Sequence, residues 1–354
     1  MLGLLFPCFS SRKKNLIIQL LILIYLGLVA FALFNYCNHC AVTSPRSLMD
    51  PANIEVSVRG DCTLDFDKLG VQEVHKYDDP SEESIIAANP NVTRGGKWAP
   101  TDCKAWQKVA IILPYRDRVH PLKLLLRRLH PMLQIQKLDY QIFVIEQAGT
   151  GQFNRGKLFN VGFMEAIKSQ DFDCLIFHDV DLLPEDDRNL YLCDEHGRHL
   201  ETATDDLRYH LKYYNYAGGV VAINAFNFQR INGFANSYWG WGNEDDDFSA
   251  RITESGLLLT RPPEIIGRYQ MVPHMKNSRS SSGNGMFFGW RRRWQTDGLN
   301  DPVGMNYTVV SIEAAPLFTK VTVDIGAPPP DMDVYMKDHS QDISLWWFLS
   351  FYYP

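Results

Sequence analysis

The chain has 354 residues, 45% of them hydrophobic, and a net charge of −6. Its length exceeds a typical single domain and suits one large α/β domain with appendages. No basic stripe indicates nucleic acid as a partner, and the acidity is too slight to imply a basic partner.

An apolar run near the N-terminus predicts a membrane anchor. Three basic residues at 12–14 precede about 19 mostly apolar residues at 16–34, a length that spans a bilayer as a helix. The basic residues lie on one side of the run only, which places the N-terminus in the cytosol. A cleaved signal peptide is the alternative, but the run is longer than a usual signal core. We therefore expect a cytoplasmic tail at 1–14 and an uncleaved type II anchor at 15–36.

The rest of the chain would lie outside the cytosol, in a compartment where disulfides form. We expect a stem at 37–60, one folded domain at 61–330 and a tail of unknown role at 331–354. Asn91 and Asn306 each begin an Asn-X-Thr glycosylation sequon, which fits such a compartment. Four cysteines of the folded domain allow three disulfide pairings. They are Cys62, Cys103, Cys174 and Cys193.

Alternating apolar runs and periodic stretches predict an α/β fold. The expected order is strand 108–113, helix 122–133, strand 141–145, helix 157–168, strand 174–178, a strand after the glycines at 218–219, helix 246–255 and strand 321–325. Strands and helices that alternate in this way form βαβ units, and continuous apolar strands suit a mostly parallel sheet. Ligands bind beyond the carboxyl ends of such strands. Residues 114–118 and 179–181 would therefore share one edge of the sheet.

Two acids follow the third strand, as Asp179-Val180-Asp181. In an extended chain their carboxylates point in different directions, so one can hold a metal while the other accepts a sugar hydroxyl. Oxygen ligands of this kind suit Mg²⁺ or Mn²⁺ together with a diphosphate. A solvated turn is the common alternative, and the buried strand before the motif and the acids downstream favour the metal site.

Two arginines follow the first strand, at Arg116 and Arg118. Guanidinium groups match phosphates, and the ring of Tyr115 between strand and arginines offers a surface for a planar base. Surface ion pairing is the alternative. Phe153 and Arg155, ahead of the second predicted helix, add another ring and another cation.

Four consecutive acids at 244–247 follow two tryptophans, each with a glycine after it. Adjacent carboxylates repel one another, and burial raises their pKa unless a cation or donor compensates. Glycine leaves the backbone free to reorient, so Trp241 suits a mobile lid. A solvated acidic helix start is the alternative. Further on, the residues alone indicate a core position for Met271, a poor partner for a hard cation, and leave His274 ambiguous.

Together these motifs resemble the β-1,4-galactosyltransferase family over roughly residues 62–328. The segments that carry the resemblance are 153–163, 179–184, 218–220, 231–234, 239–247 and 297–300. The resemblance implies an inverting transferase of the GT-A nucleotide-sugar fold, with its catalytic domain in the Golgi lumen behind a type II anchor. It would use Mn²⁺ to move galactose from UDP-galactose to O4 of a terminal N-acetylglucosamine on a glycan, and it could act as a homodimer.

The resemblance also implies a role for each site residue. The metal ligands would be Asp181, Met271 and His274, which moves Met271 from the core to the metal site. The residues in contact with the UDP-sugar would be Pro114, Tyr115, Arg116, Arg118, Phe153, Arg155, Asp179, Val180, Tyr213, Tyr216 and Gly219. The disulfides would join Cys62 to Cys103 and Cys174 to Cys193.

The acidic run would carry the chemistry. Asp245 would be the catalytic base, because an acceptor hydroxyl is a weak nucleophile and needs a carboxylate to take its proton. Glu244 would bind the donor sugar, Asp246 would lie on the acceptor and Trp241 would close over the donor. Asn243 replaces the glycine that is usual in the family at this point.

Three further positions bear on the donor. Tyr216 resembles galactosyltransferases, since its phenol fills room that an N-acetyl group would need. Ala217 is smaller than the phenylalanine common there, and Asp206 stands where vertebrate enzymes have a lysine near the phosphates. Alternatives are a transferase of N-acetylgalactosamine or N-acetylglucosamine, a glycan-binding module without catalysis, and a glycosidase. The base and metal set together speak against the binding module, and a glycosidase would have no use for a UDP pocket.

Overall fold

The computed structural model describes residues 19, 25–27, 60–273, 287 and 289–329. Within these residues, no helix combines the length and the apolar character needed to cross a bilayer. The expected anchor, stem and C-terminal tail fall almost wholly outside the described residues, and their boundaries stay predictions.

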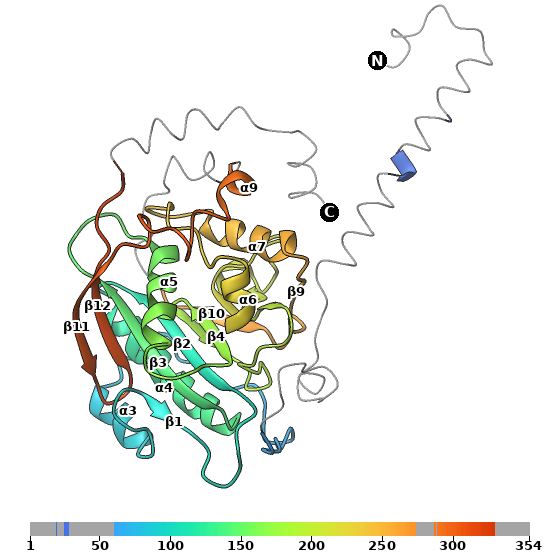
Figure 1. The fold of residues 1–354 in the computed structure, drawn as a ribbon. Helices are drawn as coiled ribbons and strands as arrows, with labels where there is room; N and C mark the ends of the chain where they lie inside the picture. Colours follow the sequence, from blue (N-terminus) through green and yellow to red (C-terminus); the bar gives the residue numbers. More distant parts are fainter. Residues whose placement is uncertain (1–18, 20–24, 28–59, 274–286, 288, 330–354) are drawn as a thin grey trace, which may run out of the picture.

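A nine-stranded sheet forms the centre of the domain (Figure 1). Its strands are β1 (Lys97–Trp98), β2 (Lys108–Tyr115), β3 (Asp139–Gln147), β4 (Cys174–His178), β6 (Gly197–His199), β8 (Val220–Asn224), β9 (Leu259–Thr260), β11 (Thr308–Ala314) and β12 (Thr319–Asp324). Their order across the sheet is β11-β12-β3-β2-β4-β8-β6-β9, with β1 paired to β3 outside this path.

Only part of this sheet is parallel. The strands β12, β3, β2 and β4 run parallel to one another, as β6 does to β9. The pairs β11–β12, β4–β8, β6–β8 and β1–β3 are antiparallel. The sheet is therefore mixed, and the expectation of a mostly parallel sheet is wrong. A helical crossover keeps neighbouring strands parallel, and such crossovers are made by α4 (Val119–Ile135) and α5 (Arg155–Ala166).

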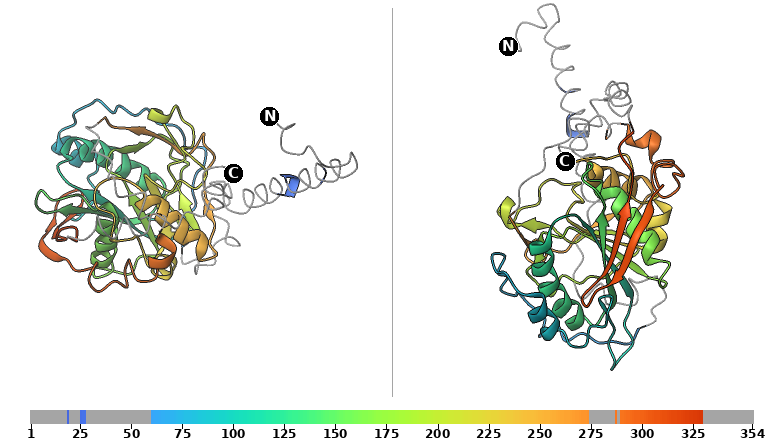
Figure 2. Two further views of the ribbon diagram at one scale, coloured as in Figure 1. Left: turned by 90° about the horizontal axis from the view of Figure 1, so that it is seen from above. Right: turned by 90° about the vertical axis from the view of Figure 1, so that its left-hand side faces the viewer.

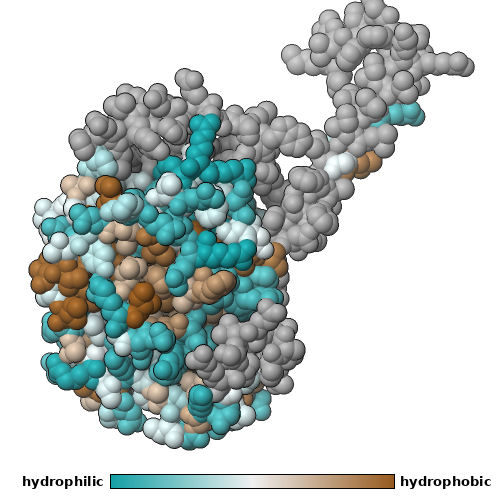
Figure 3. All heavy atoms as spheres, in the orientation of Figure 1, coloured by the Kyte–Doolittle hydropathy of each residue, from teal (hydrophilic) through white to brown (hydrophobic). Residues whose placement is uncertain are grey.

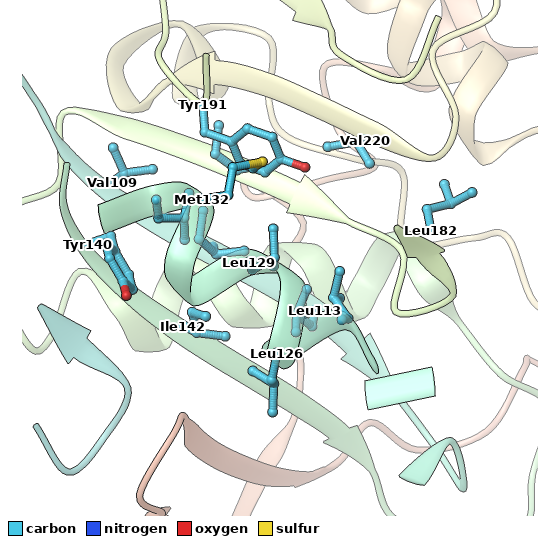
Figure 4. Packing of buried hydrophobic residues seen from close by; sticks show 14 of the residues in the cluster. Val109, Leu113, Leu126, Leu129, Met132, Tyr140, Ile142, Leu182, Tyr191 and Val220 are labelled. Atoms are coloured by element: carbon cyan, nitrogen blue, oxygen red, sulfur yellow. The ribbon is translucent and has the colours of Figure 1, made fainter. Parts of the chain in front are cut away.

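Helices cover both faces of the sheet (Figure 2). On one face packs α4, and on the other lie α5, α6 (Ala225–Arg230) and α7 (Glu244–Glu254). Successive residues of a strand point to opposite faces, so on β2 Ile111 and Leu113 enter the core on the α4 side and Ile112 enters the core on the α5 side. Burial on both faces explains the continuous apolar run of this strand. Figure 4 shows the α4 side, where Leu126, Leu129 and Met132 pack on the sheet.

The chain also forms a smaller, three-stranded sheet. It consists of β5 (Leu182–Pro184), β10 (Arg268–Met271) and β7 (Ala203–Thr204), in the order β5-β10-β7. The register places Met271 opposite Leu182, and the Val272 N–H donates to the Asp181 carbonyl at 2.8 Å. This pairing brings two segments that are distant in sequence to the end of β4.

The strands and helices predicted between residues 108 and 325 are all present, with shifted ends. The strand at 174–178 has the predicted bounds, and the other predicted strands and helices begin or end a few residues away. The helix expected from 246 begins at Glu244, so the four acids form its first turn. The disulfides join Cys62 to Cys103 and Cys174 to Cys193, as the resemblance implied. Short elements were not foreseen, among them α3 (Glu82–Ala88), η3 (Asp205–Leu207), α9 (Trp290–Arg293) and the edge strand β11.

Candidate functional site

A cavity of about 450 Å³ lies at the carboxyl ends of β2 and β4. Its lining brings together most residues that the sequence analysis selected, as far as they are described. They are Pro114, Arg116, Arg118, Phe153, Arg155, Asp179, Val180, Asp181, Tyr213, Tyr216, Gly219, Trp241, Glu244, Asp245, Asp246 and Met271. The two strand ends thus share one edge of the sheet, as expected.

Two selected residues are not part of this lining. Tyr115 is 7% exposed and packs in the core on the α4 side. It follows the alternation of Ile111 and Leu113 along β2, which turns its ring away from the cavity. Its position therefore gives no support to the expected ligand contact. His274 lies outside the described residues, and its role as a metal ligand stays a prediction.

The turn after β2 presents two arginines to the cavity. Arg116 donates from Nη1 to the Gly151 carbonyl at 2.6 Å, and its guanidinium lies 5.2 Å from the centroid of the Phe153 ring. Arg118 stands at the N-cap of α4. Among the described residues, its side chain makes no hydrogen bond or ion pair. A stacked ring and two guanidinium groups suit a planar base and a diphosphate.

Arg155 connects the Asp-X-Asp motif to the acidic run. Its Nε donates to Asp179 Oδ1 at 2.6 Å, and its Nη1 donates to Glu244 Oε1 at 3.3 Å. The guanidinium also lies 4.6 Å from the centroid of the Phe159 ring. The planar guanidinium group of Arg155 therefore sets the separation between the end of β4 and the start of α7. The sequence marks Arg155 as basic but does not indicate this bridge.

The cavity lining holds more acidic than basic side chains. Seven acidic and four basic side chains line it. Asp181 and Met271 both belong to this lining, on segments that the pairing of β5 with β10 brings together. Carboxylates suit a divalent cation such as Mn²⁺, while the thioether is a softer ligand. A bound dication would offset the excess of acids, so the residues present fit a metal of this type.

The four acids of α7 divide between the cavity and the core. Residues 244–246 line the cavity, whereas Asp247 is fully buried. Asp247 accepts from Arg251 Nε at 2.5 Å and from the Tyr238 hydroxyl at 2.9 Å. The first three acids are therefore available to a ligand, and the fourth supports the helix.

The acids on the cavity wall are electrostatically coupled. Burial, followed by the charge of the Asp245 carboxylate, raises the pKa of Glu244 to about 7 and that of Asp246 to about 8. The Tyr213 hydroxyl donates to Asp246 Oδ1 at 2.5 Å, which opposes part of this rise. Asp245 is half-buried and more open to the cavity than either neighbour. Neutral forms of Glu244 and Asp246 near pH 7 would be able to donate hydrogen bonds to a ligand.

The two tryptophans before the acids differ in environment. Trp239 is 6% exposed and packs in the core, whereas Trp241 is 50% exposed at the cavity. The residues that follow them have positive φ values, 88° at Gly240, 115° at Gly242 and 74° at Asn243. Asparagine is one of the few side chains that adopt this left-handed region. That tolerance explains how Asn243 can replace a glycine here.

The glycine pair at 218–219 makes room for two residues of the cavity wall. A Cβ at Gly218 would lie 2.3 Å from the Tyr216 hydroxyl, and one at Gly219 would lie 2.4 Å from Glu201 Oε2. A side chain at either position would displace the ring or the carboxyl group. The pair is therefore needed for close packing within the site.

Tyr216 is held from several sides. Its carbonyl accepts from Arg261 Nη2 at 2.7 Å, and its ring meets the His199 ring edge-on at 5.2 Å between centroids. Arg261 Nε in turn donates to His199 Nδ1 at 3.0 Å. Ala217 is 1% exposed and packs in the core on the α5 side, so its small side chain does not enlarge the cavity.

Sequence reasoning missed Glu201 and Lys212, which both line the cavity. Glu201 is 3% exposed, and burial, with the charges of Asp179 and Asp206, raises its pKa well above the ordinary value. Lys212 Nζ lies 4.6 Å from the ring centroid of Tyr216 and 5.7 Å from that of Trp241. Neither residue belongs to a motif, and only the folded chain brings them to the site.

Two family models match the chain. The N-terminal region of glycosyl transferase group 7 matches residues 62–194, and the N-terminal domain of galactosyltransferase matches residues 198–275. Among curated relatives, beta-1,4-galactosyltransferase 3 of Cricetulus griseus is 45% identical over 258 residues, which are 71% of this chain and 64% of that protein. Beta-1,4-galactosyltransferase 4 of Homo sapiens is 46% identical over 245 residues, 68% of this chain and 70% of that protein.

Solved structures share the fold. The catalytic domain of Drosophila β-1,4-galactosyltransferase 7 in complex with xylobiose has a TM-score of 0.54 and 27% identity, over 62% of this chain and 94% of that one. A mutant of the same protein in complex with manganese, UDP-Gal and xylobiose has a TM-score of 0.53 at the same identity and coverage. The mixed α/β fold is therefore GT-A-like. By the identity and coverage of its relatives, the chain belongs to the β-1,4-galactosyltransferase family.

Proposed function

We propose that this protein is an inverting β-1,4-galactosyltransferase that moves galactose from UDP-galactose to O4 of a terminal N-acetylglucosamine. The observation that carries the proposal is one cavity that unites the arginines after β2, the pair Asp181 and Met271, and the acids 244–246. The manganese and UDP-Gal bound by the Drosophila relative support the donor and the metal. A type II anchor at 15–36 in the Golgi membrane, a lumenal catalytic domain at 61–330 and a homodimer belong to the same proposal.

The donor would bind across the edge of the sheet. Arg116 and Arg118 would pair with the diphosphate, and Phe153, which already stacks with Arg116, would lie against the uracil. Asp179 and Val180 at the end of β4 would contact the ribose and the donor sugar. Each of these residues lines the cavity, so a single ligand can reach all of them.

Asp181 and Met271, with His274 beyond the described residues, would hold Mn²⁺. When bound, the ion supplies positive charge next to the diphosphate that leaves with UDP. The arginines after β2 would add to that charge in a site with little water. The excess of acidic side chains in the cavity lining supports this assignment.

Asp245 would take the proton of the acceptor O4 while that oxygen forms its bond to C1 of galactose and the bond from C1 to UDP breaks. Attack opposite the leaving group inverts the anomeric carbon, so no enzyme nucleophile is needed. Asp245 suits the role because it is the most open of the three acids on the wall. Glu244 and Asp246, with raised pKa values, would hydrogen-bond hydroxyls of the donor and of the acceptor.

Selection of galactose would rest on Tyr216. Its ring packs on Gly218 and against the His199 ring, and its backbone carbonyl is held by Arg261, so it cannot easily withdraw to admit an N-acetyl group. Trp241, between two glycines and half-exposed over the cavity, would exclude water by closing over the bound donor.

The test is a donor and acceptor screen on the full chain, with Mn²⁺ present or chelated. UDP-galactose, UDP-N-acetylgalactosamine and UDP-N-acetylglucosamine are each combined with N-acetylglucosamine, an N-glycan, a glycolipid and a xyloside. We expect UDP release and a β-1,4 product with UDP-galactose and an N-acetylglucosamine terminus, lost on chelation and restored by Mn²⁺. Transfer from UDP-N-acetylgalactosamine alone would contradict the donor, and transfer only to xylose would contradict the acceptor. Binding without transfer from any donor would favour a glycan-binding module.

A further inference from the structure

The strand β11 forms an open edge of the large sheet. Among the described residues it pairs only with β12, so its outer backbone groups are free to pair with another strand. Val310 is 60% exposed and Ile312 is 61% exposed. Figure 3 shows hydrophobic residues gathered on the margin of the molecule where β11 lies in Figure 1. Residues 308–312 carry no charge and are mostly β-branched, a combination that favours edge-to-edge association.

One glycosylation sequon begins directly before this strand. Asn306 is exposed, and the threonine of its sequon, Thr308, is the exposed first residue of β11. The backbone at Asn306 is held in place, since its N–H donates to the Val303 carbonyl at 3.1 Å and its carbonyl accepts from Lys157 Nζ at 2.8 Å. The Asn306 side chain is therefore attached to a fixed backbone position next to the first residue of β11.

The second sequon lies at the opposite end of the same strand. Asn91 and Thr93 are exposed in the turn between α3 and β1. Further along this turn, the Gly95 N–H donates to the Ala315 carbonyl at 2.7 Å, and Ala315 follows the last residue of β11. Two sequons that are far apart in the sequence thus stand at the two ends of one exposed edge strand.

We propose that Asn91 and Asn306 both carry N-linked glycans and that the two glycans together cover the open edge of β11. In each case the amide Nδ2 would form a bond to C1 of the first sugar of a lipid-diphosphate-linked oligosaccharide. The lipid diphosphate leaves, and the amide proton is released with it. Such glycans are bulky and hydrophilic, and they would keep another sheet from pairing with β11. This inference rests on the lumenal placement in the proposed function, and it does not depend on the transferase activity.

Occupancy is tested by the mass of the full chain, expressed in a secretory eukaryotic host and treated or not with peptide N-glycosidase. We expect two glycans on the wild type, one on Asn91→Gln, one on Asn306→Gln and none on the double variant. Thr308→Val keeps Asn306 and the shape of the strand but destroys the sequon, so it should lose the same glycan as Asn306→Gln. An unmodified wild type would overturn the proposal, and galactose transfer by the same sample would show whether the proposed function fails with it.

The covering role is tested by light scattering of the same variants in detergent. We expect the double variant to shift to species of at least twice the wild-type mass. Adding Ile312→Lys on β11 should reverse that shift, whereas Ile265→Lys, at a similarly exposed site between β9 and β10, should not. The proposal would be overturned if the glycosylated wild type already associates and Ile312→Lys reduces the mass of the associated species. That result would show that a second copy covers the edge of β11. A double variant without association would overturn it as well.

Discussion

The helix α7 places carboxylates in two opposite environments. On the cavity wall, residues 244–246 crowd together with few partners, and Glu244 Oε2 finds no hydrogen-bond partner among the described residues. On the core side, Asp247 is held by Arg251 and Tyr238, with Arg293 Nη2 3.6 Å from its Oδ2. Adjacent acids thus differ in how fully their charge is matched. An unmatched buried charge is costly to the fold, and it leaves the group available to a ligand.

The largest effect on stability should come from removing the cation that pairs with Asp247. Arg251 and Asp247 are both fully buried, so Arg251→Met leaves a buried carboxylate short of its main cation. We expect the free energy of unfolding to fall by about 3–5 kcal/mol, measured by denaturant titration. Arg291→Met is the matched control, because Arg291 pairs with Glu254 at 2.7 Å but is 62% exposed, and an exposed pair contributes about 1 kcal/mol or less. Equal losses in the two variants would contradict the comparison.

On the unmatched side, Asp245→Asn should remove activity and leave the fold intact. An amide cannot take the acceptor proton, so we expect turnover to fall by at least about 100-fold. Affinity for UDP with Mn²⁺, followed by calorimetry, should stay close to that of the wild type. The control is Glu254→Gln, at the other end of the same helix. Near-full turnover in Asp245→Asn would remove this residue as the base.

The pH dependence of stability should separate Asp246 from its neighbours. Its pKa is about 8 in the folded protein against an ordinary value of 3.8. Between these pH values the folded state holds a proton that the unfolded state has released, so stability falls as pH rises. Asp246→Asn should therefore gain about 2 kcal/mol over the wild type between pH 5 and pH 6.5, in thermal unfolding without metal or donor.

Other groups facing Asp246 also titrate or carry charge, namely Glu244, Asp245, Lys212 and Tyr213. For this reason the difference between variant and wild type is the quantity to follow. A difference that does not change with pH would show that Asp246 is charged in the folded protein throughout this range.

The smallest expected effect is on donor choice. Tyr216→Leu opens room beneath a backbone that Arg261 still holds. We expect the ratio of kcat/KM for UDP-N-acetylgalactosamine over UDP-galactose to rise about tenfold, the size of effect that one group in a pocket has. Tyr214→Leu is the control, since Arg261 holds that backbone as well but Tyr214 is not part of the cavity lining. An unchanged ratio in Tyr216→Leu would show that this ring does not select the donor.

Much of the architecture follows from local patterns. The sequence predicts β2, β3 and β4 from their apolar runs, and α4 and α5 from their helical periodicity. It can do so because burial of a strand on both faces, or of a helix along one stripe, produces a pattern among neighbouring residues. The same reasoning predicted that the ends of β2 and β4 share a site. It could not predict the antiparallel partners β8, β6 and β11, since pairing between distant segments leaves no local period.

The sequence by itself determined which side chains were available to the site and, through the family's motifs, which residues to examine. Only the tertiary structure decided which of these side chains line the cavity and which are buried in the core. It turned Tyr115 into the core by the alternation of β2, joined Asp179 to Glu244 through Arg155 and separated Asp247 from the acids before it. It also brought Glu201 to the wall beside Gly219. The physical reason is the same in each case, because the charge state and exposure of a side chain depend on partners that the fold supplies from elsewhere in the chain.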